Sequence, residues 1–201
     1  MKSELERNET LSVDERAADS RTVFGFWMYL MTDLVLFASL FAVFAVLRGP
    51  EFGGADIRNI FSLPYVLIET LALLTSSFTC GLALLCARQG SVRGALVWLC
   101  TTFVLGAVFV GMELSEFSNL VAQGYGPSRS GFLSAYFTLV GTHGTHVAIG
   151  LLWLLALIVA IVRSGLSRGN MRKLALFSLF WHFLDIVWIF IFTIVYLTGA
   201  L

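Results

Sequence analysis

Five long stretches of the sequence consist mostly of apolar residues and contain no lysine or arginine: 23–47, 63–87, 95–121, 132–162 and 174–201. A helix rises about 1.5 Å per residue, so each stretch is long enough to cross a hydrocarbon core of about 30 Å. The strands of membrane barrels instead alternate polar and apolar residues over about ten positions. The sequence therefore predicts an all-α, polytopic membrane bundle of five transmembrane helices.

The composition agrees with a membrane protein. Charged residues make up 13% of the chain, whereas soluble domains carry about 25%. Residues 1–22 differ from the rest, because they hold ten charged residues of both signs. We expect a charged, disordered cytoplasmic tail there, followed by a transmembrane domain over residues 23–201. The tail lacks the basic segment and apolar core of a cleavable signal, so the first span is expected to direct insertion.

Lysine and arginine are distributed unequally between the predicted loops. Segments 1–22, 88–94 and 163–173 carry ten of them, and the opposite side of the bundle carries three. Positive loops face the cytoplasm. This bias predicts a multi-pass protein with the N-terminus cytoplasmic and the C-terminus on the opposite, periplasmic side. The short connections predict antiparallel neighbours in one bundle.

Eight ionisable side chains lie inside the predicted spans. An acidic or basic group at the bilayer centre costs about 2.5–3.5 kcal/mol, so such groups usually face the bundle interior, a water-filled cleft or a partner. Three pairs are spaced three residues apart, which places each pair on one helix face. The eight candidates for an intramembrane polar network or for lipid contacts are Asp33, Glu69, Glu113, Glu116, His143, His146, His182 and Asp185.

The predicted topology arranges these side chains in two layers. Counting along the helices places one group near the middle of the membrane and the other near its outer surface. The central layer contains Asp33, His143, His146, His182 and Asp185, and the outer layer contains Glu69, Glu113 and Glu116. We expect the central groups to be hydrogen-bonded mainly to each other or to lipid head groups.

His143 and His146 lie among small residues, in the segment GTHGTHVAIG (residues 141–150). Small residues let helix backbones approach, and polar side chains hydrogen-bond across such contacts. Three roles for the histidines remain open: hydrogen bonding between helices, protonation or lipid head-group binding, and metal or haem ligation. His182 and Asp185 could complete a four-ligand zinc site, but an HExxH motif is absent.

The sequence gives little indication of thiol chemistry or of a catalytic motif. Cys80, Cys86 and Cys100 lie in or at the edge of apolar spans without a CxxC motif, so we expect buried hydrophobic thiols. The sequence also lacks a GxSxG elbow, a P-loop and a GxGxxG motif in a βαβ setting. No catalytic residue is predicted in this chain.

Several segments resemble subunit III of the haem-copper oxidases. They are GMELSEF (residues 111–117), GTHGTHVAIG (141–150) and WHFLDIVWIFIFTIVYLTG (181–199). The segments FGFWMYLMTDLVLFASLFA (24–42) and GPSRSGFLSA (126–135) are similar to the ubiquinol-oxidising branch of that family, the cytochrome bo type. Five spans also suit this branch, since the cytochrome c oxidase version commonly has seven.

The resemblance implies a non-catalytic accessory subunit of a proton-pumping terminal oxidase that couples ubiquinol oxidation to the reduction of oxygen to water in aerobic respiration. Such a subunit stabilises catalytic subunit I and its proton uptake, contacts the other oxidase subunits and binds phospholipid. The haems and copper belong to subunit I, and they need more histidines than the three present here. Asp33 matches a buried carboxylate of the family that is often glutamate.

Two other functions are compatible with the ionisable groups alone. A stand-alone transporter or proton relay would use the two polar layers, but its typical mid-membrane helix breaks and inverted repeat are not visible. A b-type haem protein would need two imidazoles on opposite sides of the haem, and His143 or His146 together with His182 could supply them. An optical spectrum of the chain would distinguish the haem protein from the accessory subunit.

Overall fold

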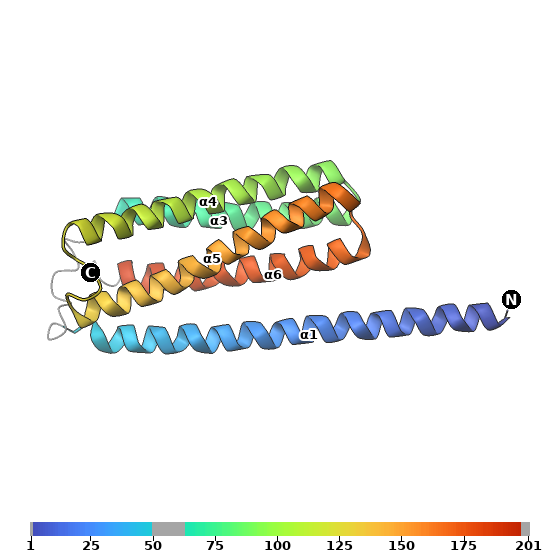
Figure 1. Cartoon of the computed structure of the whole chain (residues 1–201), viewed down its shortest axis with the longest axis horizontal. Coiled ribbons are helices and arrows are strands. Elements are labelled where there is room, and N and C mark those ends of the chain that lie inside the picture. The colour runs from blue at the N-terminus through green and yellow to red at the C-terminus, as the bar shows by residue number, and fades with distance from the viewer. Residues whose placement is uncertain (1, 50–62, 198–201) are drawn as a thin grey trace. The chain divides into compact units, whose positions relative to one another are not determined.

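The computed structural model describes residues 2–49 and 63–197, with side chains at 20–49 and 64–197. Its helices are α1 (Lys2–Leu47), α3 (Leu63–Arg88), α4 (Val92–Ala122), α5 (Gly131–Ser164) and α6 (Arg168–Ile191), followed by the π-helix η3 (Phe192–Leu197) (Figure 1). Five helical stretches are long and apolar enough to cross a membrane: Ser20–Leu47, Pro64–Arg88, Val92–Ala122, Gly131–Ser164 and Arg168–Leu197. The predicted all-α architecture with five spans is therefore confirmed, and residues 198–201 of the fifth predicted span lie outside the described residues.

The chain divides into two compact units, Met1–Leu36 and Phe37–Leu201. The first unit is the N-terminal part of α1, which is helical from Lys2 and thus continues through the predicted disordered tail. Glutamate, arginine, leucine and alanine recur in this segment, and it has no glycine or proline before Gly25. These residues favour a helix. The predicted division of the chain at residue 22 stays a prediction.

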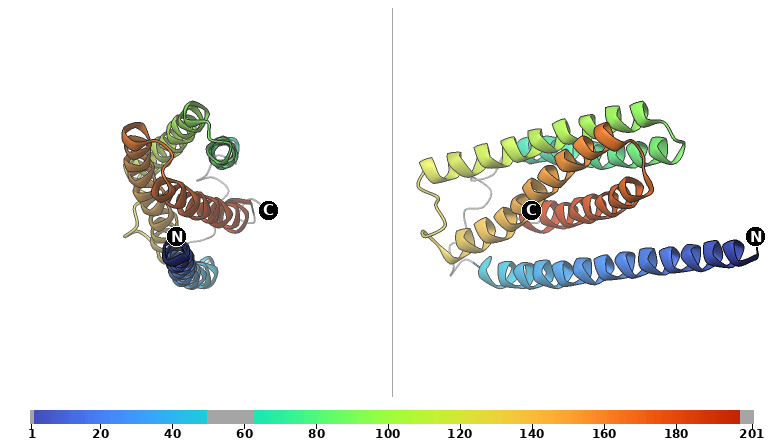
Figure 2. Two further views of the ribbon diagram at one scale, coloured as in Figure 1. Left: turned by 90° about the vertical axis from the view of Figure 1, so that its right-hand side faces the viewer. Right: turned by 45° about the vertical axis from the view of Figure 1, so that its right-hand side comes forward.

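In the second unit, α3, α4, α5 and α6 form a ring in which each helix packs against two of the others. Helix α3 contacts α4 and α6, while α5 contacts the same two helices from the other side. Figure 2 shows α5 inclined to the other helices of the bundle, with each helix running opposite to the next in sequence. Such an arrangement gives every helix one face toward the interior and one toward the surroundings.

Short polar turns define the helix ends of this bundle. Ser91, Ser130 and Ser167 precede α4, α5 and α6, and each side-chain oxygen accepts a hydrogen bond from a backbone N–H in the first turn. These are N-caps, which satisfy a donor that the helix itself leaves unpaired. Gly90 and Gly165 follow α3 and α5 with φ of 79° and 65°, a conformation that favours glycine.

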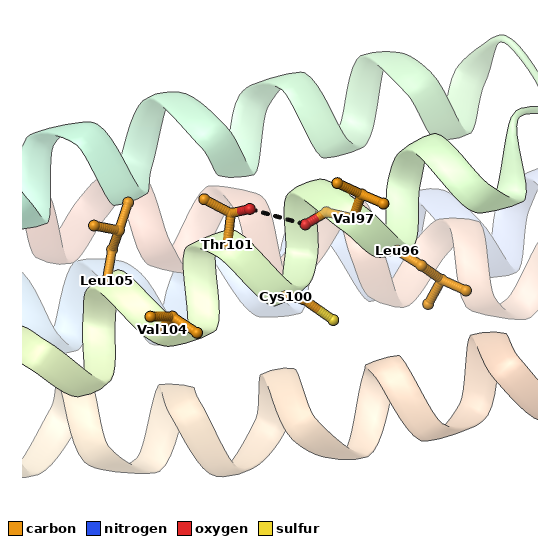
Figure 3. A pocket seen from close by; sticks show the side chains of 6 residues that line it. All are labelled: Leu96, Val97, Cys100, Thr101, Val104 and Leu105. Atoms are coloured by element: carbon orange, nitrogen blue, oxygen red, sulfur yellow. Dashed lines mark hydrogen bonds between the residues drawn. The ribbon is translucent and has the colours of Figure 1, made fainter.

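The outer faces of the helices carry large exposed apolar side chains, among them Phe78, Val97 and Leu152. Extended apolar surface is unusual on a soluble monomer and is the expected surface of a protein in lipid. On α4, Figure 3 shows six residues of one helix lining a shallow pocket of about 550 Å³: Leu96, Val97, Cys100, Thr101, Val104 and Leu105.

The cysteines differ from one another in exposure. Cys80 is buried as predicted and Cys86 is half-buried, but Cys100 is exposed on the outer face of α4. The prediction of a buried thiol was therefore wrong for Cys100. The reason is that both faces of a membrane helix are apolar, so hydrophobic neighbours in sequence do not distinguish the interior from the lipid side.

Two tryptophans of α6 fill the centre of the bundle. Trp181 Nε1 donates to Ser76 Oγ at 3.1 Å, and Trp188 Nε1 donates to Thr70 Oγ1 at 3.1 Å. Both rings are completely buried, and both acceptors belong to α3. The indole N–H groups thus obtain partners away from water, which joins α3 to α6.

Candidate functional site: buried polar groups between the helices

Three glutamates of α3 and α4 form a carboxyl cluster. Glu69 and Glu113 are buried, Glu116 is half-buried, and the three are near enough to interact electrostatically. Neither carboxyl oxygen of Glu69 has a hydrogen-bond partner among the described residues, and the same holds for Glu113 Oε1. The structure thus brings together the three members of the predicted outer layer.

Two tyrosines extend the carboxyl cluster toward α5 and η3. The hydroxyl of Tyr136 donates to Glu116 Oε1 at 3.4 Å and lies 2.8 Å from the hydroxyl of Tyr196. Both rings are buried. The wider turns of η3 carry Tyr196 at the end of α6, with its ring 6.4 Å from that of Trp188. Sequence reasoning missed this pair, although a buried phenol usually needs a partner and each tyrosine lies within an apolar span.

Glu113 reaches the backbone of α5. A Cβ atom built on Gly144 would lie 2.5 Å from Glu113 Oε1 and 2.8 Å from its carboxyl carbon. The carboxyl group therefore rests directly against the glycine Cα, and a larger residue there would have to push the carboxyl group aside. The glycine flanked by His143 and Thr145 serves as the contact point for a side chain of α4, and this explains the small residue at that position.

His143 lies in an aromatic environment. Its ring is fully buried, 5.1 Å from the ring of Trp188 and 5.9 Å from that of Phe109, which meets it edge-on. Within the described part of the chain, neither ring nitrogen has a hydrogen-bond partner. The predicted hydrogen bond from His143 to another ionisable group is thus not seen, because aromatic rings of α4 and α6 occupy the surrounding space.

His146 lies one turn further along α5. Its Nδ1 is 2.8 Å from the carbonyl oxygen of Thr142 in its own helix, and its ring is 5.4 Å from that of Phe37. The bond within α5 orients the imidazole toward the C-terminal part of α1. The contact is one of packing between helices.

His182 has a partner on α3, and Asp185 lies near both residues. His182 Nδ1 lies 2.6 Å from Ser77 Oγ, while Asp185 Oδ1 has no hydrogen-bond partner among the described residues. The two residues lie on one face of α6, as their spacing predicts. Sequence reasoning did not identify Ser77, because serine in a transmembrane helix often bonds only to its own backbone.

Asp33 belongs to the N-terminal unit, whereas the other seven candidates belong to the second unit. Its membership in a central layer with the histidines therefore stays a prediction. The other predicted central residues do not form one cluster: His143 and His146 lie on α5, and His182 and Asp185 lie on α6 beside Ser77.

The surroundings of His143 and His182 bear on the open question of metal or haem ligation. Across residues 20–49 and 64–197, no three His, Cys, Asp or Glu residues are grouped so that they could hold a metal ion. His143 is enclosed by Trp188 and Phe109, and His182 is bonded to Ser77. A haem plane needs an open face beside each axial imidazole, and the packed rings around His143 leave none.

Comparison with known proteins assigns this bundle to a family. Residues 5–200 match the family model described as cytochrome c oxidase subunit III. The chain belongs to the cytochrome c oxidase subunit III family. It is therefore a multi-pass membrane subunit that has oxidase subunits as partners, and the resemblance of its motifs is confirmed.

Three relatives cover nearly the whole chain. The cytochrome bo(3) ubiquinol oxidase subunit 3 of Pseudomonas aeruginosa is 58% identical over 189 residues, which is 93% of this chain and 90% of the relative. The quinol oxidase subunit 3 of Bacillus subtilis is 46% identical over 177 residues, 88% and 87% of the two chains. The probable quinol oxidase subunit 3 of Staphylococcus aureus is 42% identical over 196 residues, 94% and 98% of the two chains.

Proposed function

We propose that this chain is the accessory third subunit of a proton-pumping terminal ubiquinol oxidase. The observation that carries the proposal is the 58% identity over 93% of the chain to a subunit named for ubiquinol oxidation. Relatives from Bacillus and Staphylococcus also have names that specify quinol. Ubiquinol rather than cytochrome c is therefore the electron donor of the complex.

The interior of the bundle suits an accessory role. Its buried polar side chains join helices, as Trp181 does with Ser76 and His182 with Ser77. The carboxyl cluster lies among tyrosines rather than next to a nucleophile. The chain holds no haem or copper of its own, and these cofactors belong to the catalytic subunit I against which it packs.

The chain spans the bacterial inner membrane with its N-terminus in the cytoplasm and its C-terminus in the periplasm. Ten of its thirteen lysines and arginines lie in segments assigned to the cytoplasmic side. The connections between α3 and α4 and between α5 and α6 then face the cytoplasm. Its exposed apolar faces contact subunit I, the other oxidase subunits and phospholipid.

Affinity purification of the chain with a C-terminal tag, from membranes of an aerobically grown bacterium, tests the proposal. A large subunit with b- and o-type haem absorbance is expected to co-purify in a one-to-one ratio. The preparation should oxidise ubiquinol with consumption of oxygen and leave reduced cytochrome c unchanged. An unrelated tagged membrane protein of the same strain serves as the control.

Two results would contradict the proposal. Purification of the chain without a haem-bearing subunit would favour a stand-alone transporter, and oxidation of cytochrome c instead of ubiquinol would reassign the donor. An optical spectrum of the chain released from its complex tests separately whether this chain binds a haem. A Soret band that stays with this chain would show that it is a haem protein.

A further inference from the structure

A groove of about 320 Å³ runs between α4 and α5 on the outer side of the bundle. Its residues on α4 are Val110, Glu113, Leu114 and Phe117, and its residues on α5 are Gly141, Gly144, Thr145 and Ala148. Figures 1 and 2 show that α4 and α5 diverge toward the end where α4 finishes and α5 begins. The groove therefore lies where the backbones of α4 and α5 are not in close contact and side chains fill the space between them.

The groove contains one ionisable group, Glu113. The side chain is 3% exposed, and its Oε1 has no hydrogen-bond partner among the described residues. A buried acceptor left without a donor costs about 1–3 kcal/mol, and hydrocarbon offers no donor to compensate. A molecule seated in the groove with a hydrogen-bond donor at this position would remove that cost.

The α5 wall of the groove suits another helix. Gly144 and Ala148 are four residues apart, as are Gly141 and Thr145, and each pair places two small side chains on one helix face. This small-xxx-small spacing lets another helix approach along Gly141, Thr145 and Ala148, while the Glu113 carboxyl group already lies against Gly144. Leu114 and Thr145 are exposed at the two edges, where a neighbouring helix would touch them.

The depth of Glu113 argues against a phospholipid. The residue lies about 14 Å before the end of α4 at Ala122, at about 1.5 Å per residue. Helix α4 is about 46 Å long by the same rise, so a core of about 30 Å leaves about 8 Å of helix beyond each border. The carboxyl group then lies about 6 Å inside the hydrocarbon, where acyl chains have no donors and head groups do not reach.

We propose that the α4–α5 groove is a docking site for a transmembrane helix of another oxidase subunit, which donates a hydrogen bond to Glu113. The helix lies against the small residues of α5, with its donor side chain between the two walls. The identity of the partner as an oxidase subunit rests on the proposed function. The groove and its unpaired acceptor are properties of this chain and do not depend on the proposed function.

Site-specific photo-crosslinking in the intact complex tests this docking site. Benzoylphenylalanine replaces Leu114 at the edge of the groove, or Val108, an exposed residue on the opposite face of the same helix, as the matched control. After irradiation of native membranes and purification through a tag on this chain, the Leu114 position is expected to form an adduct with another oxidase subunit. The Val108 position should not form that adduct.

Two substitutions then examine the walls of the groove. Thr145→Trp fills the groove from its exposed edge and should lower the yield of the Leu114 adduct at least tenfold, while Val108→Trp should leave the yield unchanged. Glu113→Gln keeps an acceptor oxygen and should retain the adduct. Glu113→Leu removes the acceptor and should reduce the yield at least threefold.

Several outcomes would overturn the docking site. They are adducts with lipid only, adducts within this chain or with a second copy of it, no adduct from an assembled complex, and an adduct that Thr145→Trp leaves unchanged. A failure of the proposed function can be distinguished from a failure of the docking site, because it appears as the absence of a haem-bearing subunit from the purified material. A complex that contains the haem subunit but gives no Leu114 adduct overturns the docking site alone.

Discussion

Trp181 lies between two glycines of neighbouring helices, and this arrangement predicts a large effect from adding one methyl group. A Cβ atom on Gly150 would lie 2.8 Å from Trp181 Cζ3, and one on Gly106 would lie 2.9 Å from Leu151 Cδ2 and 3.0 Å from Trp181 Cζ2. The indole cannot easily move away, because its Nε1 is bonded to Ser76 and its ring is buried. Alanine at either glycine should therefore strain the bundle.

The magnitude follows from two opposing effects. Overpacking a closed core costs about 1–3 kcal/mol, while alanine is favoured over glycine in a helix by up to about 1 kcal/mol. We expect Gly150→Ala and Gly106→Ala each to lower the free energy of unfolding by about 1–2 kcal/mol. For a chain of this size that corresponds to a fall in Tm of about 2–8 °C.

The assay is thermal unfolding of the purified complex in lipid nanodiscs, followed by loss of this subunit from the complex. Gly111→Ala is the matched control on α4, because a Cβ atom there meets no atom within 4 Å. It should leave Tm unchanged or raise it. In a Trp181→Phe background the cost of Gly150→Ala should fall by at least about 0.5 kcal/mol, since the contacting ring atoms are absent. Equal Tm values for the variants at residues 150, 106 and 111 would refute the close packing of Trp181.

Three further predictions concern other contacts of the bundle. Gly144→Ala should destabilise the subunit by at most about 1 kcal/mol, because its Cβ would lie 2.5 Å from Glu113 Oε1 and would displace the flexible end of that side chain. The loss in Tm should disappear when Glu113→Ala is added, and persistence of the loss would show that the carboxyl group does not lie there. Ser77→Ala should lower the free energy of unfolding by about 1–3 kcal/mol, because it leaves His182 Nδ1 without its partner. Thr75→Ala is the control and should change Tm little, since this exposed residue is bonded within its own helix. Equal shifts in Tm for the two variants would contradict the role of Ser77. Asn170→Ala should speed tryptic cleavage of the α5–α6 turn in inside-out vesicles, because Asn170 Nδ2 donates hydrogen bonds to Ala160 O, Ser164 Oγ and Gly165 O. Ser118→Ala, which removes a hydrogen bond within α4, should leave the cleavage rate unchanged. An unchanged cleavage rate for Asn170→Ala would contradict the prediction.

The sequence predicted local contacts better than distant ones. The spacing of His182 and Asp185 placed both on one helix face, and Glu113 with Glu116 likewise, because helix periodicity depends only on residues in one segment. The partners of these groups were missed where they come from other helices. Ser77 meets His182, Tyr136 meets Glu116, and aromatic rings surround His143 where hydrogen bonds were expected.

By itself the sequence determined the membrane environment, the five helical spans and the family, because each depends on the hydropathy or motifs of continuous segments. Only the tertiary structure decided which polar groups meet and which stay unpaired. In lipid, both faces of a helix are apolar, so hydropathy does not reveal how a helix is rotated about its axis. That rotation depends on fits such as Trp181 against Gly106 and Gly150, or Glu113 against Gly144, and these exist only once the helices have packed.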